Sequence, residues 1–121
     1  MNNNLLNINK IIDILEPVLE VANSNKEINL SANIIDYNYQ NKIIRWFTFH
    51  NLKSLNLYHT NLFVKVVTLI ASALNKNTTL TELNISNNVI SSDNAIKISD
   101  ALKINTTLTK LDLGCTRLHS A

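Results

Sequence analysis

A 28-residue internal repeat is the feature of this sequence that most limits what the chain can fold into. Residues 77–81, which read Asn-Thr-Thr-Leu-Thr, recur unchanged as residues 105–109. Three stretches fit the pattern LxxLxLxxNxL at this offset, and they begin at Leu52, Leu80 and Leu108. The Asn position of the pattern holds Thr60, Asn88 and Thr116. A weaker copy that includes Ile28 and Leu30 lies in register ahead of them. A period of this length predicts a solenoid of stacked units.

The segments between these stretches carry apolar residues three and four positions apart, which is the spacing of one face of a helix. This spacing predicts helices over residues 8–22, 39–49, 63–75 and 94–103. The Leu-rich stretches predict strands over residues 27–31, 54–58, 82–86 and 110–114. No single strand–helix unit can bury its apolar face alone, so neighbouring units must stack. The predicted fold class is α/β: a right-handed solenoid with a parallel sheet on its concave face and helices on its convex face.

Residues 1–121 are predicted to form one domain of about four such units. The sequence ends at Ala121, shortly after the fourth predicted strand and before a helix that would complete that unit. Solenoids normally close each end with a polar terminal unit. We therefore expect a truncated array, or a partner that associates through the uncapped C-terminal end.

The repeat resembles leucine-rich repeat proteins of the ribonuclease-inhibitor-like kind, which also occur in NOD-like receptors. Residues 90–102 look like the strand-to-helix stretch of that family, and residues 77–80 look like its link from helix to strand. The family normally has Gly where this chain has Asn94, and Asn is the next most tolerant residue of a left-handed backbone. The resemblance covers residues 52–121 firmly and residues 8–51 loosely, and it implies a module that binds proteins.

Strand residues that point away from the Leu positions are expected to line the concave face in three rows. The first row holds Glu27, Ser54, Glu82 and Lys110, and the second holds Asn29, Asn56, Asn84 and Asp112. The third row holds Ser31, Tyr58, Ser86 and Gly114. The residues predicted to bind a partner are Glu27, Asn29, Asn56, Tyr58, Glu82, Asn84, Lys110 and Asp112. The Asn row either presents amides to a polypeptide or reflects only the high Asn content on a solvated face.

Two further features of this sequence have alternative interpretations. Glu82 and Lys110 would lie side by side on strands about 4.8 Å apart, either as a solvated pair worth less than ~1 kcal/mol or as contacts to a partner. Trp46 falls where later units carry Ala. It is therefore either a bulky core residue or an exposed aromatic anchor for a partner.

The composition argues against catalysis, metal binding and cofactors. One Gly excludes glycine-rich phosphate loops, and one Cys excludes a disulfide framework or a multi-cysteine zinc site. His59, Asn87 and Cys115 occupy one position in three consecutive units and imitate a catalytic set. However, His59 and Cys115 would lie two strands apart, roughly 10 Å, whereas a nucleophile and its base must be about 3 Å apart. No catalytic residue, metal ligand or cofactor is therefore predicted.

The formal charge is +2 and the basic residues are scattered, which disfavours nucleic acid and anionic membranes as partners. No apolar run approaches the ~18 residues that span a bilayer. The lone Cys fits the cytoplasm, where an effector delivered to a host cell would also act. The predicted function is a non-catalytic protein–protein interaction module with a protein partner of unknown identity. The alternatives are a GTPase-activating or other regulatory repeat protein and a vestigial fragment of a longer array.

Overall fold

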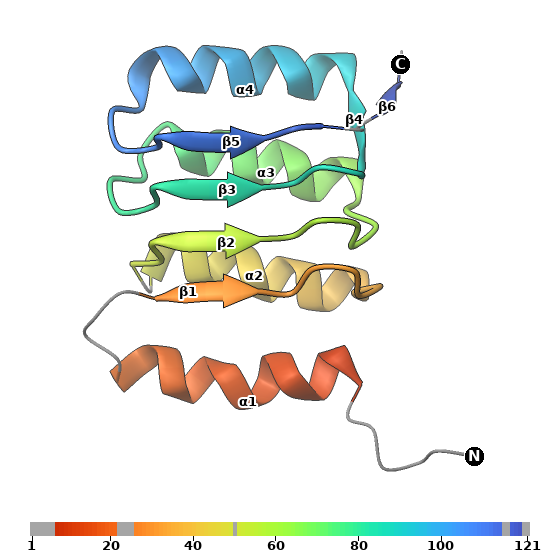
Figure 1. Cartoon of the computed structure of the whole chain (residues 1–121), viewed down its shortest axis with the longest axis vertical. Coiled ribbons are helices and arrows are strands. Elements are labelled where there is room, and N and C mark those ends of the chain that lie inside the picture. Colours follow the sequence, from red (N-terminus) through yellow and green to blue (C-terminus); the bar gives the residue numbers. More distant parts are fainter. Residues whose placement is uncertain (1–6, 22–25, 50, 115–116, 120–121) are drawn as a thin grey trace.

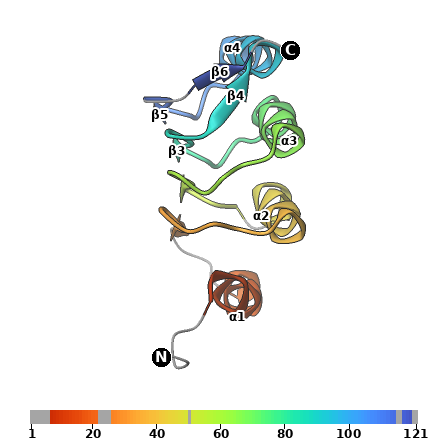
Figure 2. The same cartoon turned by 90° about the vertical axis from the view of Figure 1, so that its right-hand side faces the viewer.

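Helices and strands alternate along the chain and separate into two layers. The computed structural model describes residues 7–21, 26–49, 51–114 and 117–119. The helices are α1 (Ile8–Val21), α2 (Tyr37–Phe49), α3 (Val64–Leu74) and α4 (Ser92–Ile104). The strands of the main sheet are β1 (Glu27–Asn29), β2 (Ser54–Asn56), β3 (Glu82–Asn84) and β5 (Lys110–Asp112). Figure 1 shows these units stacked in chain order, and Figure 2 shows the helices on one side of the sheet.

The main sheet is parallel, and its strands follow one another in the order β1-β2-β3-β5. Its register aligns the first predicted row, which is Glu27, Ser54, Glu82 and Lys110. It also aligns the second row, which is Asn29, Asn56, Asn84 and Asp112. The predicted α/β solenoid with a parallel sheet is confirmed. We call the sheet face turned away from the helices the concave face.

Each strand is shorter than predicted, and an Asn or Asp side chain forms a turn where each strand ends. Asn29 Oδ1 accepts the backbone N–H of Ser31 over 3.0 Å. Equivalent contacts of 2.9 Å, each to the residue two positions later, are made by Asn56, Asn84 and Asp112. Such a turn satisfies one backbone N–H locally. Backbone hydrogen bonds between units continue past it, since the Ala32 N–H donates to the Tyr58 carbonyl oxygen over 2.7 Å. The strands end at the second row, two residues before the predicted boundaries.

The connection from strand to helix is built in a similar way in successive units. The backbone takes positive φ values of 60°, 52° and 58° at the equivalent positions Ala32, His59 and Asn87. Two short strands that were not predicted follow this bend in the later units, β4 (Val89–Ser91) and β6 (Arg117–His119). They form a separate parallel sheet in which Val89 pairs with Arg117. The 28-residue offset of this pair shows that the repeat also governs the connections.

The Leu and Ile positions of the repeat form the core between the sheet and the helices. In the two central units the first, fourth and sixth positions are buried, namely Leu52, Leu55, Leu57, Leu80, Leu83 and Ile85. Burying one such side chain stabilises the fold by about 1.5–3 kcal/mol relative to leaving it exposed. Trp46 is 0% exposed and belongs to the same core. The core interpretation of Trp46 is therefore right, and the exposed-anchor interpretation is wrong.

Asn94 does not take the left-handed backbone that a glycine position would suggest. It lies in the first turn of α4, its φ is not positive, and its side chain is buried. Its Nδ2 donates to the carbonyl oxygen of Val64 over 3.0 Å. Its Oδ1 accepts from the hydroxyl of Thr68 over 2.7 Å. A side chain that glycine lacks therefore ties α4 to α3.

Asn88 stands at the Asn position of the repeat pattern and holds two neighbouring turns together. Its Oδ1 accepts the backbone N–H groups of Thr60 over 3.2 Å and of Leu62 over 3.0 Å. Its Nδ2 lies 3.0 Å from the carbonyl oxygens of Leu57 and Ile85. The buried amide is fully satisfied, as buried polar groups generally must be. This network supplies the physical reason for Asn at this position.

Candidate protein-binding surface

Five of the eight residues predicted to bind a partner line one shallow hollow across β2, β3 and β5. The hollow has a volume of about 150 Å³. Its predicted members are Asn56, Glu82, Asn84, Lys110 and Asp112, and Ser54, Leu55 and Leu83 complete its lining. The sheet register thus brings side chains from three units of the repeat into one place on the concave face.

The three remaining predicted residues lie outside this hollow. Glu27 and Asn29 are exposed on β1, in the same two rows but one strand further along the sheet. Tyr58 follows β2 and is 40% exposed, and its ring centroid lies 6.0 Å from that of His59. These residues extend the candidate surface at its margins but do not form its centre.

The third predicted row is not a row of exposed side chains. Ser86 is only 4% exposed, although Tyr58 at the equivalent position is 40% exposed. The hydroxyl of Ser86 donates to Asn84 Oδ1 over 2.6 Å, within the turn that ends β3. The same turn at Asn56 leaves Tyr58 exposed, so the burial of Ser86 is particular to this unit. The prediction of a third surface row is therefore wrong at Ser86.

The Asn row presents donors rather than complete amides. The Oδ1 atoms of Asn29, Asn56 and Asn84 accept the backbone N–H groups of the turns. Their Nδ2 groups have no hydrogen-bond partner anywhere in the described part of the chain. Each Oδ1 is held toward its own turn, so each Nδ2 is the group left for a ligand. Asp112 ends the row with a carboxylate, whose Oδ1 accepts the Gly114 N–H.

Glu82 and Lys110 are neighbours in the register of β3 and β5, and both side chains are exposed. No ion pair within 4.0 Å joins these two residues, both of which the structure describes. The hollow therefore offers a carboxylate and an ammonium group side by side. Each is accessible to an opposite charge on a ligand.

His59 and Asn87 do come together, but as neighbours in stacked turns. Asn87 Nδ2 lies 3.0 Å from His59 Nδ1. Cys115, the third residue of the His59, Asn87 and Cys115 set, lies outside the described residues. Within the described ranges, no group of three His, Cys, Asp or Glu side chains could hold a metal ion.

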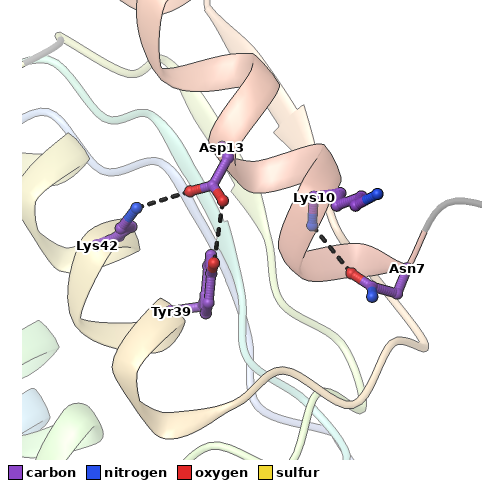
Figure 3. A network of polar contacts seen from close by, with 5 residues as sticks. All are labelled: Asn7, Lys10, Asp13, Tyr39 and Lys42. Carbon is purple, nitrogen blue, oxygen red and sulfur yellow. Dashed lines mark hydrogen bonds and ion pairs between the residues drawn. The ribbon is translucent and has the colours of Figure 1, made fainter.

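Among the described residues, Asp13 and Tyr39 have clearly shifted pKa values, and Figure 3 shows them where α1 meets α2. Lys42 Nζ lies 2.7 Å from one carboxylate oxygen of Asp13, and the Tyr39 hydroxyl donates to the other over 3.0 Å. The hydrogen bond from Lys42, and then that from Tyr39, lowers the pKa of Asp13. The hydrogen bond to Asp13 raises the pKa of Tyr39.

The sequence analysis missed this contact between α1 and α2, which we call the Asp13 clasp (Asp13, Tyr39 and Lys42). Asp13 and Lys42 are 29 residues apart, which is close to one repeat, so the spacing would have placed them on adjacent helices. Asn9 adds a second link, since its Nδ2 donates to Asp36 Oδ2 over 2.9 Å. These polar contacts hold the first helix onto the solenoid and have no evident role in binding.

Comparison with known families agrees with the repeat. A family model described as Leucine Rich repeat matches residues 76–99 and 105–121. Together with the stacked strand–helix units, this match defines the fold as a leucine-rich repeat solenoid of the α/β class. No curated protein matches the sequence. Within the described residues, no helix combines the length and apolar character needed to cross a bilayer.

One similar solved structure is that of "Leiomodin-1 Actin-Binding Site 2 (ABS2)". It superimposes with a TM-score of 0.74 at 27% sequence identity. The match covers 88% of this chain and 61% of that chain, so this protein spans about three fifths of the length of the leiomodin-1 structure. The likeness therefore includes most of the stacked units described above.

Proposed function

We propose that this protein is a non-catalytic interaction module that binds a protein partner through the concave face of its sheet. The observation that carries the proposal is the hollow across β2, β3 and β5, where amide, carboxylate and ammonium groups lie together. A rigid solenoid holds such short polar side chains at fixed spacing, which suits recognition rather than chemistry. The spacing from strand to strand is about 4.8 Å.

The polar groups in the hollow indicate which chemical groups a partner needs in order to bind them. The Nδ2 groups of Asn56 and Asn84 call for acceptor oxygens, such as main-chain carbonyls of the partner. Glu82 and Lys110 call for a basic and an acidic side chain close together. Complementary charges of this kind mainly speed association and set orientation. The partner surface we propose is therefore polar and of mixed charge.

Actin is the first partner that we propose to test. The support is the likeness to a structure named for an actin-binding site, which extends over 88% of this chain at 27% identity. The proposal concerns binding alone, because this chain spans only 61% of that structure.

We further assign the repeat to the ribonuclease-inhibitor-like subtype and the protein to the cytoplasm. The 28-residue offset between units, with a full α-helix in each, supports the subtype. The single Cys supports a reducing compartment.

The test is co-sedimentation of the whole chain with filamentous actin, together with fluorescence anisotropy against monomeric actin. Glu82→Lys and Lys110→Glu each reverse one charge of the hollow. We expect each change to raise the dissociation constant by about tenfold or more, because like charges then meet in the contact. Lys65→Glu is the matched control, since Lys65 is exposed on α3, away from the concave face.

The outcomes test separately whether actin is the partner and whether the concave face is the binding surface. Binding that is equally strong in the wild type and in both hollow variants would show that the concave face is not the binding surface. Absence of binding to either form of actin would dismiss actin. The surface would then be tested by comparing proteins captured by the wild-type chain and by Glu82→Lys. An identical captured set would argue against the concave face.

A further inference from the structure

A second hollow lies beside β4, at the edge of the stack where strands lead into helices (Figure 1). It has a volume of about 220 Å³ and combines side chains from three successive units of the repeat. Ile34 and Val89 are its apolar walls and are 63% and 38% exposed, and Leu62 of the unit between them is buried. Its polar lining consists of His59, Asn61, Asn87 and Asn88. We call this hollow the edge pocket.

The pair formed by His59 and Asn87 offers both a donor and an acceptor to a ligand. Asn87 Nδ2 lies 3.0 Å from His59 Nδ1. If the amide donates, the other nitrogen of the neutral imidazole carries the proton, and the amide oxygen is left to accept. If the imidazole donates to the amide turned by 180°, its other nitrogen accepts and the amide N–H groups are left to donate. Either arrangement leaves a donor and an acceptor side by side, with no other side-chain hydrogen bond among the described residues.

Two buried amide side chains hold the edge pocket in shape. Asn88 Oδ1 accepts the backbone N–H of Leu62 over 3.0 Å. Gln40, which is 0% exposed, donates from Nε2 to the carbonyl oxygen of Asn61 over 3.0 Å. Its Oε1 accepts the backbone N–H of Phe63 over 3.1 Å. Residues 61–63 are therefore tied to α2 and to the third unit, and a site that is already ordered loses less entropy on binding.

The lining of the edge pocket favours an uncharged group that is partly aliphatic. None of its described lining residues is Asp, Glu, Lys or Arg, in contrast to the hollow on the concave face. An unpaired charge would be costly to bury there, whereas an amide finds both of its hydrogen-bond partners at His59 and Asn87. Ile34 and Val89 are two units apart, roughly 10 Å at the strand spacing, which leaves room for one aliphatic side chain over Asn61.

The size of the edge pocket favours one residue of a polypeptide. Pockets that enclose a whole small ligand generally start at roughly 300 Å³, which is larger than this one. A nucleic acid would need cationic groups for its phosphates, and the described lining has none.

We propose that the edge pocket is a second binding site for the protein partner. One main-chain amide of the partner bonds to His59 and Asn87, and the aliphatic side chain of the same residue lies between Ile34 and Val89. This inference rests on the proposed function, because it takes the partner to be a protein.

Tyr58 connects the edge pocket with the hollow on the concave face. It follows β2 at the margin of that hollow, and its ring centroid lies 6.0 Å from that of His59. Val89 follows Asn84 by five positions, which corresponds to roughly 17 Å of extended chain at most. One extended partner segment of about six residues therefore reaches both sites. It carries charged residues over the hollow and an aliphatic residue at the edge pocket.

The test is a titration of the isotope-labelled whole chain, followed by heteronuclear NMR, with N-acetyl-leucine N-methylamide. This probe is one leucine residue with an amide group on each side. We expect a dissociation constant in the millimolar range, as suits a ligand this small. The largest shifts should fall on the backbone amides of Asn61 and Val89 and on the side-chain amide of Asn87. N-acetyl-glycine N-methylamide lacks the aliphatic side chain and should bind at least about fivefold more weakly.

Variants test the two halves of the edge pocket separately. Asn87→Gly removes the amide but tolerates the positive φ of 58° at this position, and it should weaken binding about threefold to tenfold. Its matched control is Asn51→Gly, since Asn51 has a φ of 51° and lies outside the edge pocket. Val89→Thr makes one wall polar and should also weaken binding several-fold. Val64→Thr is its control, because Val64 is 46% exposed at the start of α3, outside the edge pocket.

The probe distinguishes failure of this inference from failure of the proposed function. It needs no protein partner, so it reports on the edge pocket whether or not actin binds. Glu82→Lys alters only the hollow and should leave binding of the leucine probe unchanged.

Three results would overturn the inference. The first is the absence of shifts at these amides with probe on the order of tens of millimolar. The second is equal binding of the leucine and glycine probes. The third is a set of shifts gathered around Ser54 and Glu82 in the hollow. Circular dichroism checks that each variant is folded, and the shift map of the wild type decides the matter if a variant is not.

Discussion

The Nδ2 of Asn94 donates a hydrogen bond of 3.0 Å to the carbonyl oxygen of Val64, which lies 30 residues earlier in the chain. The bond joins the first turn of α4 to the first turn of α3. Asn94 stands where the resemblance noted in the sequence led us to expect Gly, a residue that has no side chain to make this bond. The Asn side chain at this position is therefore a contact between neighbouring units and not part of a left-handed turn.

Replacing Asn94 by Ala should lower the free energy of unfolding by about 1–3 kcal/mol, because a buried hydrogen-bonded side chain is lost. Urea denaturation measures the change. Asn75→Ala is the matched control, since Asn75 is exposed at the end of α3 and should change stability by less than about 0.5 kcal/mol. Equal losses in the two variants would contradict a specific role for the Asn94 contact.

Asn88→Asp should be more damaging, because it keeps the size of the side chain but removes its donors and buries a charge. We expect a loss of about 3 kcal/mol or more at neutral pH, the usual cost of an uncompensated buried charge. Part of the loss should return as the pH falls and the new carboxyl becomes protonated. Asn33→Asp should cost less, since Asn33 is only half buried. A pH-independent loss in Asn88→Asp would argue against the buried-charge explanation.

Trp46 is the single Trp of the chain and reports directly on the core. Its fluorescence should be blue-shifted in the native protein and should shift to the red on unfolding. Trp46→Ala should lower the free energy of unfolding by about 3–5 kcal/mol, the range for deleting a large buried aromatic side chain. Trp46→Phe should cost less because it leaves a smaller cavity. Native emission at the wavelength of free Trp in water would contradict the buried position.

The Asp13 clasp predicts a defined pH dependence of stability. The pKa of Asp13 is lower in the folded chain, so the clasp contributes stability above the unfolded pKa and loses it as the pH falls through the folded pKa. Asp13→Asn should therefore be less stable than the wild type at neutral pH, and the difference should vanish in acid. Thermal unfolding at several pH values measures this, and a difference that persists in strong acid would contradict it.

Tyr39 contributes a pH dependence of stability with the opposite direction, because its contribution is lost at high pH. Its pKa is raised in the folded chain, so its contribution is present below the ordinary value of 10.0 and is lost as the pH rises through the folded pKa. Tyr39→Phe should accordingly lose its stability difference from the wild type in strong alkali. Unchanged differences across that range would show that the hydroxyl does not contribute through Asp13.

Sequence reasoning predicted the parts of the candidate surface that depend on the repeat alone. The 28-residue offset placed Glu82 beside Lys110 and Asn84 beside Asp112, and the sheet has this register. The offset predicts which residues become neighbours because equivalent units stack with the same geometry. The burial of Ser86 was missed because the repeat does not specify the hydrogen bond of its hydroxyl to Asn84 Oδ1, and the equivalent residue one unit earlier is Tyr58.

The sequence by itself determined that the chain is a stacked strand–helix solenoid, since the period and the apolar spacing are local properties that repeat. Only the tertiary structure decided which polar side chains join neighbouring units and which remain available for a partner. Asn94 and Asn88 are buried between units, whereas the Nδ2 groups of Asn56 and Asn84 in the hollow have no hydrogen-bond partner among the described residues. All four are the same residue type, and their roles differ because neighbouring units bring acceptors to the first two and only the chain's own turns to the others.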